Sequence, residues 1–387
     1  MRTGIFLFGG VEMDDASGGP PAPTDRRYNN QQVWDATERI IDTGVLCDQL
    51  GFDSYWFTEH HFQYEGYEVV PNGILISAIL AERTKQIRLG TMFNIVGQWH
   101  PLRLAEDFAT MHNISKGRGI LGIGRGTVPR EAEPLGTQIG SFDNPDQADA
   151  DRINRLQFDE AVEVMHMALD QETFSFHGEV YDFPPPGIPD RGGFVEELSL
   201  LPRPLYPYET WQAITSPPTL ETVPVKGWGG VMWLKHYSFM KHFWDRFAEL
   251  YEQTHGNALA PGEKRMLVVN TCVADSYEEA VAQVKNGHDE YWKFLGPYGW
   301  SKGYMGPDGG PAPAGLIPTF EESIENKVWL VGTADQVAEG LNWYHEYLGG
   351  VENLTLFPAM PGDSYSQVAE QLHRLAEGVL PQLPGGS

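Results

Sequence analysis

The chain has few cysteines and a shortage of basic side chains. Cys47 and Cys272 are its only thiols among 387 residues, so it offers neither a disulfide framework nor the spacing of a metal site. Lysine and arginine number 27 against 53 acidic residues, which gives a formal net charge of −26. A surface of this sign lacks the basic footprint of a nucleic-acid-binding protein and repels anionic membranes.

Long apolar runs are also missing. No segment approaches the length of a transmembrane helix, and the apolar run at residues 5–8 is too short for the core of a signal peptide. We therefore expect a soluble, cytoplasmic protein that binds neither nucleic acid nor membrane. The sequence contains no internal repeat, Walker motif, serine nucleophile elbow or zinc signature, and we predict no metal site.

What the sequence does contain is an alternation of strand-like and helical segments. The strand-like segments lie at residues 4–10, 53–57, 87–92, 119–123, 210–215, 227–233, 266–273 and 353–357. Each is followed by a helical segment, and alternation of this kind implies a parallel sheet. We predict one α/β domain over residues 1–387, a (β/α)8 TIM-type barrel with long insertions at its C-terminal face. A doubly wound sheet is the competing topology.

Four segments rich in glycine, proline or aspartate interrupt this pattern and are interpreted as insertions or lids, with a connector as the alternative for residues 184–209. They lie at about residues 11–28, 127–150, 184–209 and 296–318. The last is too long for a simple connection, which makes it a lid candidate. A small hairpin is expected at residues 174–183, and capping patterns predict that helices begin after Ser276 and Thr333.

Three ionisable residues occupy consecutive positions just after the second strand. Glu59, His60 and His61 stand at its carboxyl end, where parallel α/β proteins build their sites. Histidines beside aromatic residues often belong to a core, and adjacent histidines in a strand point to opposite faces, which disfavours shared metal binding. A proton-transfer role is the functional alternative because the pKa of histidine lies near neutrality.

Two further strand ends carry the features of an anion site. Gly122-Ile123-Gly124-Arg125-Gly126 lacks the third glycine of a dinucleotide fingerprint, but it allows close approach of a ligand, and Arg125 can bind phosphate. Thr215-Ser216-Pro217 offers hydroxyls and N–H groups at a helix start. Taken singly, each is explained as well by a turn or a helix cap. Together they resemble a barrel phosphate site.

As a set, several motifs resemble those of the bacterial luciferase-like flavin monooxygenase family. The match is dense over residues 50–126 and rests elsewhere on architecture. Its motifs are Glu59-His60-His61-Phe62, the segment from Gly90-Thr91 to His100-Pro101, Arg103-Leu104-Ala105-Glu106-Asp107, Ser115-Lys116-Gly117-Arg118 and Gly122-Ile123-Gly124-Arg125-Gly126. They occur in the family's order on consecutive barrel strands.

The resemblance implies a (β/α)8 barrel that takes reduced FMN from a separate flavin reductase. The flavin would react with O2 to give a C4a-hydroperoxide that oxidises a small, mostly apolar substrate. A homodimer is also expected from the family. Two alternatives are a deazaflavin-dependent oxidoreductase that transfers hydride on the same fold, and a non-catalytic flavin-binding protein.

The resemblance also assigns residues. His60 matches the active-site histidine, with Glu59 and His61 as its support. The positions expected to bind the cofactor are Met92 and Phe93, where the family has a non-proline cis peptide bond, Gly124, Arg125, Thr215 and Ser216, with Trp233 as a weaker candidate. Two departures stand out, because Gly124 replaces the cysteine of light-emitting luciferases and Ile214 replaces an acidic residue of their phosphate segment. The first argues against light emission.

Overall fold

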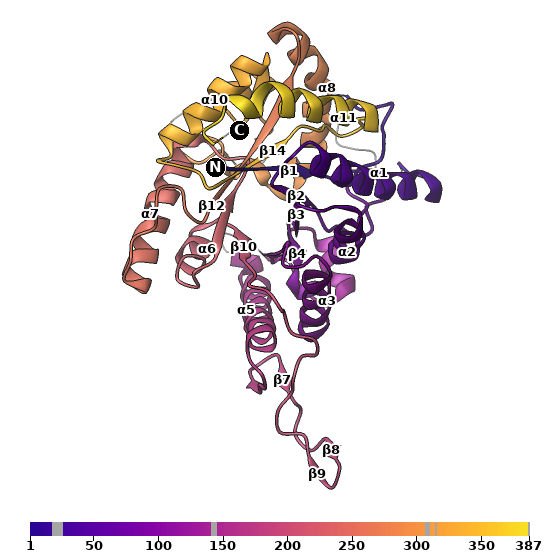
Figure 1. Cartoon of the computed structure of the whole chain (residues 1–387), viewed down its shortest axis with the longest axis vertical. Coiled ribbons are helices and arrows are strands. Elements are labelled where there is room, and N and C mark those ends of the chain that lie inside the picture. Colours follow the sequence, from indigo (N-terminus) through magenta and orange to yellow (C-terminus); the bar gives the residue numbers. More distant parts are fainter. Residues whose placement is uncertain (18–25, 141–144, 306–309, 314–315, 386–387) are drawn as a thin grey trace.

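The computed structural model describes residues 1–17, 26–140, 145–305, 310–313 and 316–385 (Figure 1). Eight parallel strands form a closed barrel, in which each strand pairs with the next and the last pairs with the first. They are β1 (Arg2–Leu7), β2 (Ser54–Phe57), β3 (Arg88–Thr91), β5 (Gly119–Gly124), β10 (Thr210–Ala213), β11 (Gly229–Met232), β12 (Arg265–Val273) and β14 (Asn353–Phe357). Closure confirms the predicted barrel and excludes the open doubly wound sheet.

Helices surround this barrel (Figure 1). They are α1 (Asn30–Gln49), α2 (Gly73–Arg83), α3 (Pro101–Ile114), α5 (Ala148–Asp170), α6 (Pro217–Thr222), α7 (Tyr237–His255), α8 (Tyr277–Leu295), α10 (Ala334–Tyr347) and α11 (Tyr365–Arg374). The side chains of Ser276 and Thr333 accept hydrogen bonds from the third residue of their helices, which confirms both predicted helix starts. Among the described helices, none has both the length and the apolar character needed to cross a membrane.

Several short elements lie in segments that were predicted as loops or went unrecognised. The interval 127–150 contains α4 (Pro129–Ala132), and the interval 296–318 contains the 3-10 helices η4 (Gly296–Tyr298) and η5 (Trp300–Gly303). Both intervals were expected to be loops because they are rich in proline and glycine, yet proline is also common in the first turn of a helix. Further additions include β4 (Asn94–Ile95), which pairs with β5, then α9 (Phe320–Glu325) and β13 (Trp329–Gly332), which pairs with β12.

The proline-rich segment 184–209 differs from the expected C-terminal insertions. It follows the hairpin of β6 (Phe176–His177) and β7 (Asp182–Phe183), which confirms the hairpin predicted at 174–183, and it contains a second hairpin of β8 (Pro189–Asp190) and β9 (Gly193–Phe194). This arm projects from the body (Figure 1). Because the segment leads from the end of α5 into the start of β10, it belongs to the amino ends of the strands. Of the two alternatives for this segment, connector or lid, its position between α5 and β10 favours the connector.

Glycines on some strands make room for tryptophans from others inside the barrel. Trp56 and Trp211 are both buried in the interior. A Cβ at Gly90 would come within 2.4 Å of the Trp56 ring, and one at Gly229 within 2.3 Å of the Trp211 ring. The barrel interior is therefore filled by large side chains opposite residues without side chains.

Gly122 allows the backbone of β3 to approach β5, and this contact yields a stability prediction. A Cβ at Gly122 would lie 2.0 Å from the carbonyl oxygen of Thr91, an atom that cannot move without disturbing the sheet. We expect Gly122→Ala to lower the free energy of unfolding by about 2–3 kcal/mol. Gly193→Ala is the control, because its nearest neighbour would be 3.8 Å away. Equal stability of both variants in urea denaturation would contradict the predicted crowding.

Candidate active site

His60 lies beyond the carboxyl end of β2 and is held between two buried carboxylates. Its Nε2 lies 2.8 Å from Glu68 Oε2, and its Nδ1 lies 3.0 Å from Glu131 Oε1. The side chains of Glu68 and Glu131 are only 1% and 2% exposed. Gln63 Nε2 also donates to Glu131 Oε1 at 2.7 Å. Both ring nitrogens of the histidine are therefore engaged by the protein itself.

The carboxylates control the charge of this histidine. Burial alone would lower the pKa of His60, but the charges of Glu68 and Glu131 raise it from 6.5 to about 10. Burial raises the pKa of the Glu68 carboxyl, and the nearby imidazolium offsets this only in part. Glu131 is also buried, yet His60 and Gln63 bring its pKa below the usual value. At neutral pH His60 is a protonated cation.

Glu59 and His61, expected as support for His60, contact each other instead. Glu59 Oε1 accepts a hydrogen bond from Trp99 Nε1 at 2.8 Å and lies 3.3 Å from His61 Nε2. The Glu59 side chain is fully buried, whereas that of His61 is 16% exposed. The structure therefore separates the predicted cluster into two units, and the partners of His60 are Glu68 and Glu131, which sequence reasoning missed.

Five aromatic side chains line the barrel mouth beside His60, and we call Phe8, Trp233, Tyr291, Phe294 and Trp300 the aromatic wall. Phe294 lies 6.1 Å from the His60 ring and 6.0 Å from Phe8, measured between ring centroids. Phe8 stacks on Tyr291 at 5.7 Å and contacts Trp233 at 5.8 Å, and Trp233 contacts Trp300 at 5.7 Å. The predicted candidate Trp233 thus belongs to an apolar surface that begins at His60.

Two buried polar groups on this wall lack hydrogen-bond partners within the described part of the chain. Asn270, at 0% exposure, accepts from Trp233 Nε1 at 3.0 Å, but its Nδ2 donates to nothing. The hydroxyl of Tyr291 is likewise buried and unpartnered. They are two of several such groups among the described residues, but both contact Trp233, so they are placed to bind the polar edge of a ligand that lies against its ring. Neither was predicted from the sequence.

Met92 and Phe93, assigned to the cofactor by resemblance, follow β3 at the same end of the barrel. The peptide bond between them is cis, as the resemblance implied. Phe93 packs against Gly124, where an added Cβ would lie 3.1 Å from the Phe93 Cβ. The close approach of these two predicted positions gives glycine a packing role at residue 124.

Arg125 follows β5 and is engaged by α5. Its Nη1 lies 3.0 Å from Asp151 Oδ1 and 3.0 Å from Asn154 Oδ1. Asp151 also accepts from Arg155 Nη2 at 3.0 Å. The guanidinium is only partly buried, with 21% of the side chain exposed. One carboxylate is therefore shared by two arginines, which leaves Arg125 donors for a further acceptor.

Thr215 and Ser216 follow β10, the strand that pairs with β5. The hydroxyl of Thr219 accepts from the backbone N–H groups of Thr215 and Ser216, at 3.3 and 3.2 Å. Ser216 caps the six-residue helix α6 in a reciprocal capping box. The N–H groups that were expected to bind an anion therefore already donate to Thr219. Thr215 itself is exposed, and it lies beside the strand end that carries Arg125.

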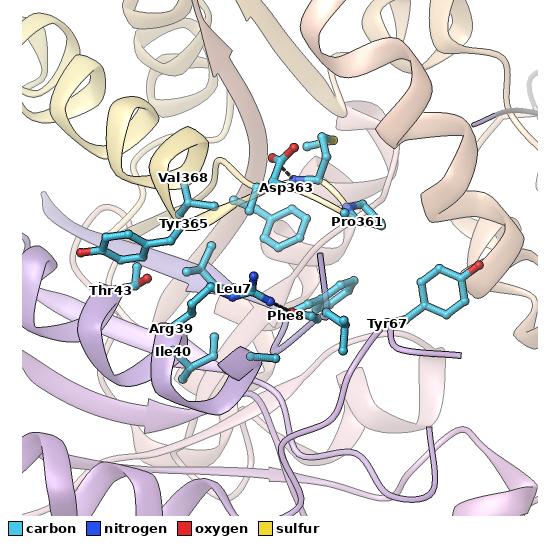
Figure 2. Close-up of a pocket in the computed structure, with 17 residues that line it drawn as sticks. Leu7, Phe8, Arg39, Ile40, Thr43, Tyr67, Pro361, Asp363, Tyr365 and Val368 are labelled. Carbon is cyan, nitrogen blue, oxygen red and sulfur yellow. Dashed lines mark hydrogen bonds between the residues drawn. The ribbon is translucent and has the colours of Figure 1, made fainter. Parts of the chain in front are cut away.

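A small pocket adjoins the aromatic wall between the end of β1, α1 and the segment before α11 (Figure 2). It shares Phe8 and Tyr67 with the surroundings of His60, and its cavity volume is about 50 Å³. Arg39 lines one side and Asp363 another, and burial raises the pKa of Asp363 to about 7. Ligand pockets usually measure several hundred Å³, so this one is too small for a ring-bearing ligand alone.

A buried ionic network joins the segment after β1 to α8 behind the wall. Tyr67 stacks on Phe294 at 5.0 Å, and its hydroxyl donates to Glu290 at 2.6 Å. Arg26 Nη1 lies 3.1 Å from the same carboxylate, which also accepts from the backbone N–H of Ser17 at 3.0 Å. These bonds hold Tyr67 against Phe294 of the aromatic wall. The centre of the predicted loop 11–28, residues 18–25, lies outside the described residues.

The fold is a (β/α)8 barrel, and its candidate site brings polar and aromatic groups together at the carboxyl ends of the strands. The family model of the luciferase-like monooxygenases matches residues 1–349. The chain belongs to this family, whose members are flavin-dependent monooxygenases and related oxidoreductases.

The proteins to which the chain is similar include both FMN-dependent and F420-dependent enzymes. It is 27% identical over 331 residues to 3,6-diketocamphane 1,6-monooxygenase from Pseudomonas putida, which covers 80% of this chain and 83% of that protein. The structure of that enzyme's oxygenating constituent, a type II Baeyer–Villiger monooxygenase in complex with FMN, aligns with a TM-score of 0.73 at 22% identity over 99% of both chains. The F420-dependent glucose-6-phosphate dehydrogenase of Amycolatopsis mediterranei is 28% identical over 155 residues, 39% of this chain and 44% of that one.

Proposed function

We propose that the protein is a two-component monooxygenase that uses reduced FMN and O2 to oxidise a small, mostly apolar organic substrate. The observation that carries the proposal is the His60 cation, held between the buried carboxylates of Glu68 and Glu131 at one end of the aromatic wall. A positive charge with an apolar surface beside it suits chemistry in which negative charge develops away from water. The FMN complex of the Pseudomonas putida relative supports the choice of cofactor.

The residues present fit a flavin mononucleotide. Asn270 Nδ2 and the Tyr291 hydroxyl offer hydrogen bonds to the polar edge of the ring system, because both are buried and unpartnered. Arg125 and Thr215, at neighbouring strand ends, would hold the phosphate, with Ser216 as the cap of the adjoining helix. When bound, reduced FMN would supply the electrons that activate O2.

The other predicted positions would shape the ring pocket. The cis peptide segment Met92–Phe93 and the close packing of Phe93 against Gly124 form one side of the barrel mouth. Trp233, held by Asn270, belongs to the other side. These groups would orient the ring and exclude water from it.

His60 would act as a cation and as a proton donor, and not as a base. Its imidazole is protonated at neutral pH, and both nitrogens already face carboxylates. To donate from Nε2 towards the cofactor, the ring would have to leave Glu68 while Glu131 continued to hold Nδ1. Glu68 and Glu131 would thus position the histidine, whereas Glu59 and His61 would support the loop around Trp99.

A separate flavin reductase would supply the reduced FMN. The Pseudomonas putida relative is described as an oxygenating constituent, which supports a division of reduction and oxygenation between two proteins. The expected homodimer and cytoplasmic location remain predictions.

Tryptophan fluorescence distinguishes the two cofactors. Because Trp233 and Trp300 lie on the aromatic wall, we expect reduced FMN to quench the emission under anaerobic conditions and to bind at least about tenfold more tightly than a reduced deazaflavin. The similarity to the F420-dependent dehydrogenase motivates the deazaflavin alternative. The opposite preference would favour that alternative and hydride transfer without O2. Oxygen-dependent product in an assay with reductase would exclude a non-catalytic flavin-binding protein.

A further inference from the structure

One buried lysine at the carboxyl end of β11 has no role in the function proposed above. Lys235 follows Trp233 by two residues, and only 4% of its surface is exposed. The turn that carries it is bonded to η5, because the backbone N–H of His236 donates to Gly303 O at 3.0 Å. Gly303 leaves room for the lysine stem, since a Cβ there would come within 1.8 Å of Lys235 Cδ. The lysine is therefore enclosed by the packing of two segments.

The ammonium group of Lys235 has no hydrogen-bond or ion-pair partner among the described residues. Burial, with a smaller contribution from the neighbouring cation Lys302, lowers its pKa to about 8, so that it still carries a charge at pH 7. A buried charge without a counter-ion is costly, and no carboxylate in the part of the chain that the structure describes is paired with Lys235. An unpaired buried cation is therefore a candidate binding group for an external anion.

The segments that enclose Lys235 also build the aromatic wall. Trp233 precedes it on the turn after β11, and Trp300 lies on η5 together with Gly303. The two tryptophan rings are 5.7 Å apart. The wall thus runs from the His60 cation at one end to Trp233 and Trp300 at the other, and these two residues stand on the same two segments that enclose Lys235.

We propose that Lys235 binds a carboxylate group of the substrate, whose apolar part lies against the aromatic wall. The pairing would satisfy the ammonium donors and offset the cost of its burial. This inference rests on the proposed function, because it names the class of compound oxidised there, an organic acid with an apolar ring or chain.

Paired neutral and anionic probes test the inference without cofactor or turnover. Phenylacetate and phenylacetamide have the same ring, and only the first carries a charge. Binding of each probe is followed by the tryptophan fluorescence of the flavin-free protein. The acid is expected to bind at least about tenfold more tightly than the amide. Lys235→Met should reduce this preference to about twofold or less, whereas Lys302→Met, which removes a neighbouring exposed charge, should retain it.

Thermal stability provides a second readout. If Lys235 serves ligand binding, replacing its unpaired charge with the apolar methionine side chain should raise the Tm, by about 2 °C. A purely structural role predicts a lower Tm. Failure of wild-type protein to prefer the acid, retention of the preference in Lys235→Met, or a fall in its Tm would each overturn the inference. None of these outcomes depends on whether reduced FMN binds, so failure of the proposed function would be seen separately.

Discussion

Replacing His60 by glutamine is expected to lower the free energy of unfolding at pH 7 by about 3–5 kcal/mol. The reason is that Glu68 and Glu131 would remain buried after losing the cation between them. Urea denaturation of the two proteins measures the difference. His61→Gln is the matched control, and we expect it to cost less than about 1 kcal/mol because its partner Glu59 keeps the hydrogen bond from Trp99.

The pH dependence of the difference in unfolding free energy between wild type and His60→Gln identifies the cause of that difference. Folding raises the pKa of His60 from 6.5 to about 10, so the ion pairs contribute their full stability below pH 6.5. That contribution is lost as the pH rises through about 10, where the folded histidine loses its proton. The difference in unfolding free energy between wild type and His60→Gln should therefore become smaller as the pH rises from 6.5 to about 10. A gap that stays constant, or equal losses in His60→Gln and His61→Gln, would show that the carboxylates do not hold a charged histidine.

Replacing Arg125 by alanine is expected to weaken FMN binding by about ten- to a hundredfold, which corresponds to the loss of charged hydrogen bonds to phosphate. Riboflavin has the same ring without the phosphate, and its affinity should change little. In wild type we expect FMN to bind at least about tenfold more tightly than riboflavin. Fluorescence titration with both flavins measures the preference.

Arg155→Ala is the control for this experiment. Arg155 contacts the same carboxylate as Arg125, on Asp151, so its removal alters the local charge without removing the proposed phosphate ligand. It should leave the preference for FMN within about threefold of wild type. Equal binding of FMN and riboflavin by wild type, or equal losses in both arginine variants, would remove Arg125 from the cofactor site.

The barrel fold could be predicted from the sequence because the signals that determine its strands and helices are local. Apolar strands alternate with helices whose starts are encoded within four residues, as Thr333 and Gln336 show by forming a capping box. Segment 184–209 was harder to place, because its composition marks an irregular segment without indicating which end of the barrel it reaches. Its position depends on the order of elements, since it precedes β10.

The candidate site was predictable only in part. His60 stood out because ionisable residues directly followed a strand, and the cis bond at Met92–Phe93 was implied by the family resemblance. Glu131, 71 residues away along the chain, gave no comparable signal, because only folding brings it against the His60 ring. The same holds for Asn270, whose free amide is recognisable only once the barrel interior is known.

The proposed use of reduced FMN and O2 is tested by mixing the anaerobic complex of the protein and reduced FMN with oxygenated buffer. Stopped-flow absorbance would follow the return of oxidised flavin while an oxygen probe follows O2. We predict that O2 is consumed in a fast phase and that oxidised flavin returns in a later, separate phase, because a site that excludes water retains the activated oxygen. Simultaneous O2 consumption and flavin oxidation at the rate of free FMN, or no binding of reduced FMN, would contradict the proposed function.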